Sequence, residues 1–250
     1  ITGITFNSQS NLGNAELSLG VTDYPTLSAA QADGLVVTSS GKGEMTLTDV
    51  GAALSGDFSG IDAEEVTYRF AEGVGETITL SDNFKFANAS TLVDSAGATV
   101  DLGDADVSQI RYLELENTTT LVTTQAKLEA GNGSDALEVE GFFGARMIVD
   151  EFGAGSGTPA ITGFDGIDLT LNYANGVTAQ SLEADFINGH FAQSGPRSLQ
   201  ANLPAGDNET LTINLTEDTI SYDLSRVHVS NGNVLFDIDV DNLTASDRLD

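Results

Sequence analysis

The segment Gly131-Asn132-Gly133-Ser134-Asp135 combines residue types and a spacing that could bind calcium. Gly131 and Gly133 permit a tight turn whose backbone carbonyls face a cation, and Asp135 adds a carboxylate. The segment fits the calcium-binding nonapeptide pattern Gly-x-Gly-x-Asp-x-apolar-x, in which Leu137 would fill a solenoid core. Calcium takes roughly six to eight oxygen ligands, so a second turn would have to supply the others. The alternative is an ordinary Gly-Asn-Gly turn before a strand.

Three further groups of residues could supply oxygen ligands to calcium. They are Asp101, Asp104 and Asp106 in an expected loop, the pair Asp165 and Asp168, and Asp237, Asp239 and Asp241 in an expected strand, followed by Asn242. Loops commonly carry calcium ligands, and alternate residues of a strand share one face. Carboxylates in one row repel each other unless a cation bridges them. A solvated acidic surface is the alternative for each group.

The charge of the chain excludes some partners. Asp and Glu number 38 against 9 Lys and Arg, which gives a net charge of −29 over 250 residues. Nucleic acids and anionic membranes require a basic face, so neither is an expected partner. A folded chain this acidic repels itself, and bound divalent cations or high external salt would relieve that repulsion. We therefore expect calcium as the cofactor.

Residues for catalysis are scarce. The chain has no Cys and two His, His190 and His228, which lie too far apart in sequence for a metal-binding pair on one helix. It contains no Gly-x-Ser-x-Gly elbow, phosphate-binding loop or dinucleotide-binding fingerprint. Paired carboxylates could hydrolyse glycosides, but the chain lacks the Trp platforms common in carbohydrate clefts. We therefore expect a protein that is not an enzyme.

Strand signals predict an all-β protein. Short β-rich runs are bounded by Gly, Asn, Asp or Ser, which favour turns. One short helix is expected within Tyr24–Gly34, where Pro25 precedes an Ala-rich stretch and Gly34 ends it. The expected strands are Ala15–Val21, Leu35–Ser39, Glu44–Thr48, Glu65–Phe70, Glu76–Leu80, Gln109–Glu116, Thr118–Thr124, Ala136–Glu140, Arg146–Phe152, Ile167–Tyr173, Glu209–Leu215, Thr219–Leu224 and Val234–Val240.

A weak internal repeat predicts a parallel β-helix, or β-solenoid. Segments that begin at Gly60 and Gly163 both read Gly, apolar, acid, then a strand, and Gln109 begins a looser copy. Their apolar residues, Ile61, Ile110 and Phe164, are 110 − 61 = 49 and 164 − 110 = 54 residues apart. Each interval suits two solenoid coils of roughly 20–25 residues. A solenoid-like domain is therefore expected over residues 1–195, with chance similarity as the alternative.

Residues 196–250 are expected to form a small antiparallel β region. Asn231-Gly232 lies between two β-rich runs, and this dipeptide strongly favours a hairpin. Gly195-Pro196 marks the boundary, because both residues interrupt regular structure.

The units at Gly60 and Gly163 resemble those of bacterial surface-layer (S-layer) proteins with a β-helical region. The unit at Gly131–Val139 is similar to the repeats of RTX-type secreted proteins. The resemblance implies calcium-triggered folding outside the cell, assembly into a sheet or fibre, and no catalysis. Within this sequence, Gly131, Gly133 and Asp135 fall on the ligand-turn pattern of that family.

Three functions follow as hypotheses. The first is an extracellular, self-assembling structural protein of S-layer or matrix type, a homo-oligomer stabilised by calcium at the cell surface. The second is an adhesin domain that binds glycans, with cell-surface polysaccharide as its partner. The third is a β-helical enzyme acting on polysaccharide. No run of apolar residues approaches the roughly 20 that a membrane helix needs, so membrane insertion is not expected.

Overall fold

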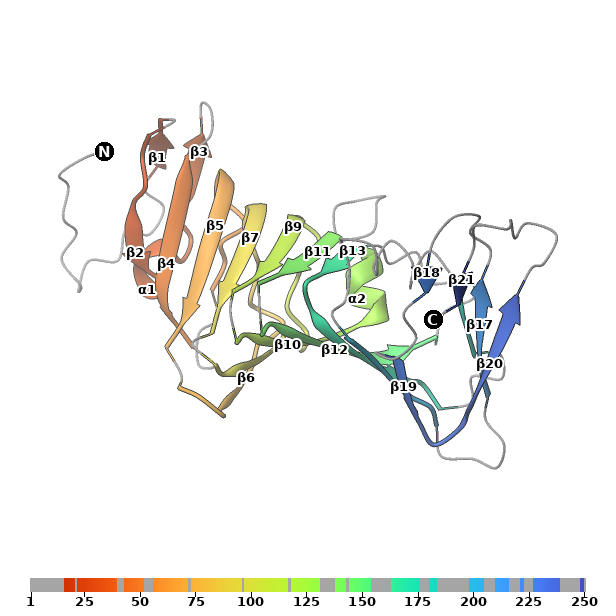
Figure 1. The fold of residues 1–250 in the computed structure, drawn as a ribbon. Coiled ribbons are helices and arrows are strands. Elements are labelled where there is room, and N and C mark those ends of the chain that lie inside the picture. Colours follow the sequence, from red (N-terminus) through yellow and green to blue (C-terminus); the bar gives the residue numbers. More distant parts are fainter. Residues whose placement is uncertain are drawn as a thin grey trace.

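The protein is nearly all β and forms a solenoid of about six turns (Figure 1). The computed structural model describes residues 16–249, except for gaps at 21, 40–42, 52–55, 72, 96, 117, 131–137, 143, 154–162, 176–179, 184–197, 205–209, 216–220, 223–226 and 239–247. Every strand pair in the described residues is parallel, as expected of a chain that returns to the same edge of a sheet once per coil. The predicted all-β solenoid fold is therefore confirmed. Within the described residues, neither helix is long or apolar enough to span a bilayer.

Two seven-stranded parallel sheets form the long sides of the solenoid. Sheet I contains β2 (Thr26–Ser28), β4 (Glu44–Val50), β5 (Asp62–Phe70), β7 (Asn88–Asp94), β9 (Ile110–Leu115), β11 (Glu138–Gly141) and β13 (Gly163–Asp165). Sheet II contains β6 (Thr77–Thr79), β8 (Thr99–Asp101), β10 (Thr120–Thr124), β12 (Arg146–Phe152), β14 (Asp168–Tyr173), β16 (Ser198–Asn202) and β19 (Val227–Ser230). From β5 to β14 the chain alternates between sheet I and sheet II, so each sheet gains one strand per coil over this stretch.

Smaller elements complete the ends of the solenoid. Strands β1 (Glu16–Leu19) and β3 (Val36–Ser39) pair at the N-terminal end, where α1 (Ala29–Ala32) lies inside the expected helix region. Helix α2 (Gln125–Ala130) follows β10 and was not expected. At the C-terminal end, β15 (Gln180–Glu183), β17 (Thr210–Leu215) and β20 (Asn233–Ile238) form one sheet, and β18 (Ser221–Tyr222) pairs with β21 (Arg248–Leu249).

Alternation of apolar and polar residues explains why these segments form strands. In β14, Leu169, Leu171 and Tyr173 are buried while the residues between them are partly exposed. Each inward residue meets an inward residue of the next coil, as Leu169 does with Met147 and Leu199. Paired residues of neighbouring coils are 20 to 31 positions apart, so the coils vary in length and some exceed the predicted value. The core is one continuous apolar column between the sheets.

Aromatic rings fill the core at one level of the solenoid. Phe58, Tyr68, Phe84 and Phe86 pack with ring centroids 4.9–6.1 Å apart. The Tyr68 hydroxyl is buried and accepts a hydrogen bond of 2.9 Å from the backbone N–H of Ala87. This bond satisfies the Ala87 N–H, which has no contact with water, so Tyr68 contributes packing through its ring and a polar contact through its hydroxyl.

The corners between sheet I and sheet II repeat one backbone conformation. Four successive corners have a positive φ, and three of them are occupied by glycine: Gly75, Gly97 and Gly144, with φ of 85°, 93° and 93°. Thr118 occupies the corner between Gly97 and Gly144 with φ of 65°. The left-handed region suits glycine and disfavours a β-branched residue, so Thr118 is strained where its counterparts are not.

Charged residues alternate from coil to coil along the side that leads into sheet I. Asp57, Lys85 and Asp106 are joined in order by parallel bridges, and Lys85 Nζ lies 2.8 Å from Asp57 Oδ2. Lys127 on α2 continues the series, with its Nζ 2.8 Å from the carbonyl oxygen of Ala105. We call this the charge ladder. Each residue thus lies beside neighbours of opposite charge, which favours the observed stacking order.

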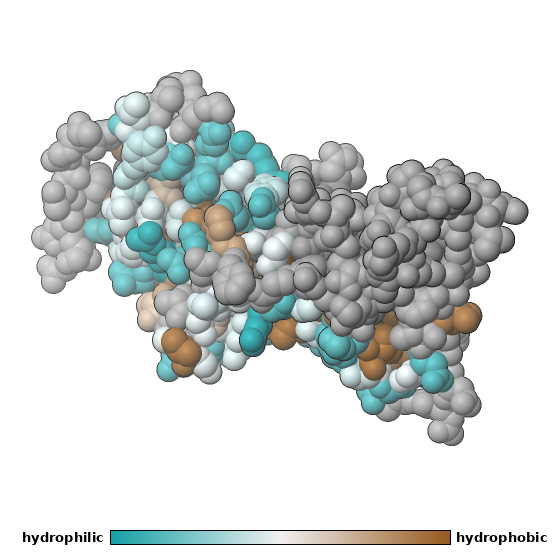
Figure 2. All heavy atoms as spheres, viewed as in Figure 1, coloured by the Kyte–Doolittle hydropathy of each residue, from teal (hydrophilic) through white to brown (hydrophobic). Residues whose placement is uncertain are grey.

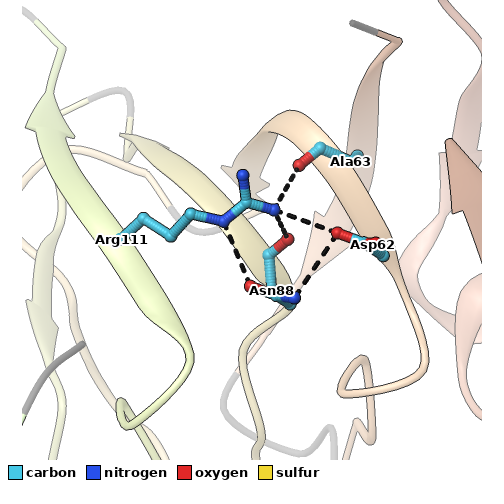
Figure 3. A network of polar contacts seen from close by, with 4 residues as sticks. All are labelled: Asp62, Ala63, Asn88 and Arg111. Carbon is cyan, nitrogen blue, oxygen red and sulfur yellow. Dashed lines mark hydrogen bonds and ion pairs between the residues drawn. The ribbon is translucent and has the colours of Figure 1, made fainter. Parts of the chain in front are cut away.

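A second ladder confirms that the 49-residue interval spans two coils. Arg111 on β9 donates to Asp62 Oδ1, 49 residues earlier, over 3.0 Å (Figure 3). Asn88 of the intervening coil lies between them and accepts from Arg111 Nε over 3.1 Å. The unit at Gly163 is not equivalent, because the strand that follows it, β14, belongs to sheet II, whereas β5 and β9 belong to sheet I.

The predicted antiparallel C-terminal region is wrong for the described residues. Strands β16 and β19 pair in parallel, as do β17 with β20 and β18 with β21. Asn231, with φ of 65°, turns the chain from β19 to β20, but these two strands pair with different sheets. The Asn-Gly turn is therefore a solenoid corner, because the preceding coil already offers a parallel partner to each strand: β16 to β19 and β17 to β20. Sheet II also crosses the predicted boundary at residue 195, since β14 pairs with β16; the division into two domains stays a prediction.

Candidate functional site

Most of the predicted calcium ligands lie outside the described residues. Gly131, Gly133 and Asp135 fall in the gap at 131–137, and Asp239 and Asp241 fall in the gap at 239–247. The backbone of Asp237 belongs to β20, but its side chain is not described. The RTX-like turn and the C-terminal carboxylate row therefore remain predictions.

Asp101, Asp104 and Asp106 are all described, and two of them accept hydrogen bonds from their own turns. Asp101 Oδ1 accepts from the Gly103 N–H over 2.9 Å, and Asp106 Oδ1 accepts from the Ser108 N–H over 3.0 Å. Asp104 is exposed in the turn between them. Hydrogen bonds from the hydroxyl and N–H of Ser108 hold the pKa of Asp106 below its usual value, and nearby Lys85 and Lys127 act in the same direction.

The described residues do not bring these carboxylates together around a cation. Within the described ranges, no group of three or more His, Cys, Asp or Glu side chains is arranged to hold a metal ion. Asp101 and Asp106 each accept a hydrogen bond from their own turn, and Asp104 is exposed between them. Asp106 in addition lies near the positive charges of Lys85 and Lys127.

The outer face of sheet I gathers a different set of carboxylates, which we call the acidic face. It consists of Glu44, Glu65, Glu114 and Glu140. Glu44 lies beside Glu65 on neighbouring strands, and Glu114 lies beside Glu140 in the same way. Adjacent strands are about 4.8 Å apart, so each pair holds two like charges at close range. Tyr112 donates its hydroxyl hydrogen to Glu140 Oε2 within this face.

The carboxylates of the acidic face perturb one another. Partial burial raises the pKa of Glu65, and repulsion from Glu44 and Glu64 raises it further. Partial burial also raises the pKa of Glu114, with added repulsion from Glu65 and Glu140. Both shifts mean that the folded protein disfavours the charged form of these groups. A bound or diffuse divalent cation would relieve this cost, because it lowers the repulsion without protonation.

The sequence contained a signal for this face that the motif analysis missed. Glu occupies outward positions of several strands of sheet I, as Glu44, Glu65, Glu114 and Glu140 do. Recognising the face requires the coil register, since these residues are far apart in sequence. In the view of Figure 2, hydrophilic residues cover much of the surface over β4 to β9.

Outward polar residues of sheet II form ladders between coils. Asn172 donates to Asp150 Oδ1 over 2.6 Å, and Asn202 donates to Asn172 Oδ1 over 2.7 Å. Ser198 donates to Asp168 Oδ1 over 2.8 Å. These side chains therefore bind the neighbouring coil. His228 is exposed at the end of the same sheet, and His190 lies outside the described residues.

Comparisons with known proteins do not assign a family. No family model matches the chain, and no match was found among curated proteins or solved structures. The resemblance to S-layer and RTX-type proteins therefore remains an expectation from the sequence.

Proposed function

We propose that this chain is an extracellular, non-enzymatic structural protein of S-layer or matrix type that self-assembles and is stabilised by calcium. The observation that carries the proposal is the acidic face: carboxylates of neighbouring coils lie side by side on the solenoid, and in each pair one of them, Glu65 or Glu114, has a raised pKa. Such a face is costly for an isolated chain at neutral pH. It becomes favourable when divalent cations neutralise it.

The organisation of the polar residues supports a structural role. The charge ladder, the Asp62–Asn88–Arg111 network and the Asn ladder of sheet II all join one coil to the next. Their side chains therefore stabilise a rod of regular cross-section. A rod that presents repeating surfaces suits assembly into a sheet or fibre, in which each weak contact recurs many times.

The residues at hand suit calcium as a surface counter-ion better than as an ion enclosed by a dedicated cage. Glutamate oxygens are the hard ligands that calcium prefers, and the pairs Glu44/Glu65 and Glu114/Glu140 supply them in twos. The described residues offer no larger group. The RTX-like turn at Gly131–Asp135 is the candidate for a true binding loop. The alternative function, an adhesin domain for cell-surface polysaccharide, has no described feature in its favour.

Thermal melting tests the calcium part of the proposal. We expect a higher midpoint in millimolar calcium chloride than in excess EDTA, because a ligand bound to the folded state stabilises it by mass action. Sodium chloride at equal ionic strength separates screening from binding, and magnesium tests preference for the larger ion. Equal midpoints in all four solutions would remove the basis for calcium.

Light scattering tests the assembly part. We expect scattering to rise on addition of calcium and to fall again with chelator. A chain that stays monomeric at high concentration in calcium would contradict the proposed function.

A further inference from the structure

Asn231 and Gly232 form an exposed corner near the C-terminal end of the solenoid. The corner joins β19, the edge strand of sheet II, to β20 (Figure 1). Both residues are exposed, and Asn231 has a φ of 65°. The side chain of Asn231 donates a hydrogen bond of 3.3 Å from Nδ2 to the carbonyl oxygen of Leu203 in the preceding coil. Water and dissolved base can therefore reach the side-chain amide.

The backbone N–H that follows Asn231 is free, unlike the one that follows Asn202. Within the described ranges, the Gly232 N–H donates no hydrogen bond. The N–H of Leu203, which follows Asn202, donates to the carbonyl oxygen of Ser230 over 3.1 Å. Glycine also has no side chain that could shield its nitrogen. The nitrogen next to the Asn231 side chain is thus accessible, whereas the one next to Asn202 is held in the ladder between coils.

A comparison with Asp33-Gly34 shows that a following glycine is not sufficient for this accessibility. The Gly34 N–H donates to the carbonyl oxygen of Asp57 over 3.0 Å, so its nitrogen is engaged. The other Asn-Gly steps of the chain each include a residue outside the described ranges; they begin at Asn132, Asn175 and Asn188.

We infer that Asn231 is a site of spontaneous deamidation. The backbone nitrogen of Gly232 gives its proton to a base and attacks Cγ of Asn231. A C–N bond forms, the Cγ–Nδ2 bond breaks, and ammonia leaves after taking up a proton. Water then opens the resulting succinimide at either carbonyl and yields aspartate or isoaspartate. Water and a base from the solvent suffice for this reaction, and it needs only a local opening of the corner, which is easiest where few contacts hold the backbone.

Deamidation changes the corner in two ways. Aspartate lacks the N–H that the carbonyl oxygen of Leu203 accepts, and it makes the net charge of −29 more negative by one unit. Isoaspartate adds a methylene to the main chain between β19 and β20, whose registers are set by β16 and β17. The corner must absorb the added length, so the adjoining ends of the two strands shift or fray. The age of a molecule is thereby recorded at this end of the solenoid.

Peptide mapping by mass spectrometry tests the inference on the folded chain during incubation at mildly alkaline pH. We expect Asn231 to deamidate about tenfold or more faster than Asn202, because the ladder bond that follows Asn202 must break first. Both aspartate and isoaspartate should appear at position 231, since water can attack either carbonyl of the succinimide. Equal rates at the two residues, or an Asn231 that keeps its amide, would overturn the inference.

Gly232→Ala tests whether the reaction passes through the Gly232 nitrogen. Gly232 is exposed and its φ is not positive, so a Cβ there meets no backbone strain. We expect deamidation at position 231 to slow by about tenfold, because the methyl group shields the nitrogen. An unchanged rate would mean direct hydrolysis of the side chain and would contradict the inference. Wild type unfolded in urea gives the rate of an unrestrained Asn-Gly step. If Asn231 reacts only in urea, the folded corner protects it and the inference fails.

Discussion

The buried hydroxyl of Tyr68 allows one hydrogen bond of the core to be measured. Tyr68→Phe removes the oxygen that accepts from the Ala87 N–H and keeps the ring among Phe58, Phe84 and Phe86. Tyr68 and Ala87 are both 0% exposed, so water cannot replace the lost acceptor. Leaving a buried N–H without a partner costs about 1–3 kcal/mol. For a chain of this length, about 2 kcal/mol lowers the melting midpoint by about 4–8 °C.

Tyr173 provides the matched control for this prediction. Its ring packs edge-on against Phe152, and it is 8% exposed. Among the described residues its hydroxyl has no hydrogen-bond partner. Tyr173→Phe therefore removes a desolvated polar atom without breaking a bond, and we expect the free energy of unfolding to stay equal or to rise slightly.

Urea unfolding of both variants, followed by circular dichroism, measures the difference. We expect Tyr68→Phe to lower the transition midpoint and Tyr173→Phe to leave it in place. If the two substitutions have the same effect, the reasoning fails, because the Ala87 bond would then contribute nothing.

Three further substitutions test other features of the fold. Thr118→Gly should raise the free energy of unfolding by about 0.5–1 kcal/mol in thermal melts, because φ of 65° is strained for Thr; Thr118→Ala, which keeps a Cβ, should gain less. Gly166→Ala should lower the free energy of unfolding by about 2 kcal/mol or more, because a Cβ at this position, where φ is +72°, would lie 2.3 Å from the carbonyl oxygen of Gly141. An unchanged free energy of unfolding would contradict the corner geometry. Glu114→Gln should be more stable than wild type by a few tenths to about 1 kcal/mol at pH 7. The raised pKa of Glu114 means that the folded state holds its proton more tightly, so wild-type stability falls as pH rises through that pKa. The gain should vanish near about pH 3, where Glu is protonated in both states; a gain independent of pH would refute this electrostatic cause.

The strands of the solenoid were predictable where alternation and turn residues coincide. Arg146–Phe152 was expected with the bounds that β12 has. Strand β7 was missed, since its outward positions include Leu92 and its inward positions include Thr91, which blurs the alternation. Thr91 is buried, and among the described residues its hydroxyl has no hydrogen-bond partner. The strand accommodates this polar residue because β5 and β9, in the neighbouring coils, pair with β7 on both sides.

The prediction of an antiparallel C-terminal region failed because a local signal was read without its context. Asn231 does adopt the left-handed conformation that a hairpin turn uses. A solenoid corner uses the same conformation, and the choice between the two depends on whether a parallel partner is already present. Strands β16 and β17 supply such partners, and neither is adjacent in sequence to the turn.

The acidic face could not be predicted for a related reason. Glu65 and Glu114 are 49 residues apart, yet repulsion from Glu65 helps to raise the pKa of Glu114. Only the coil register brings them near each other. Sequence inspection instead favoured carboxylates that are close along the chain, and of these Asp101 and Asp106 accept hydrogen bonds from their own turns.

The charge ladder has a consequence for how this protein can change in length. Asp57, Lys85, Asp106 and Lys127 lie in successive coils, so deleting one coil would set Asp against Asp or Lys against Lys. Deleting two coils would restore the match within this ladder. Loss or gain of a coil pair therefore keeps the alternation of charge along this side, whereas loss or gain of a single coil breaks it.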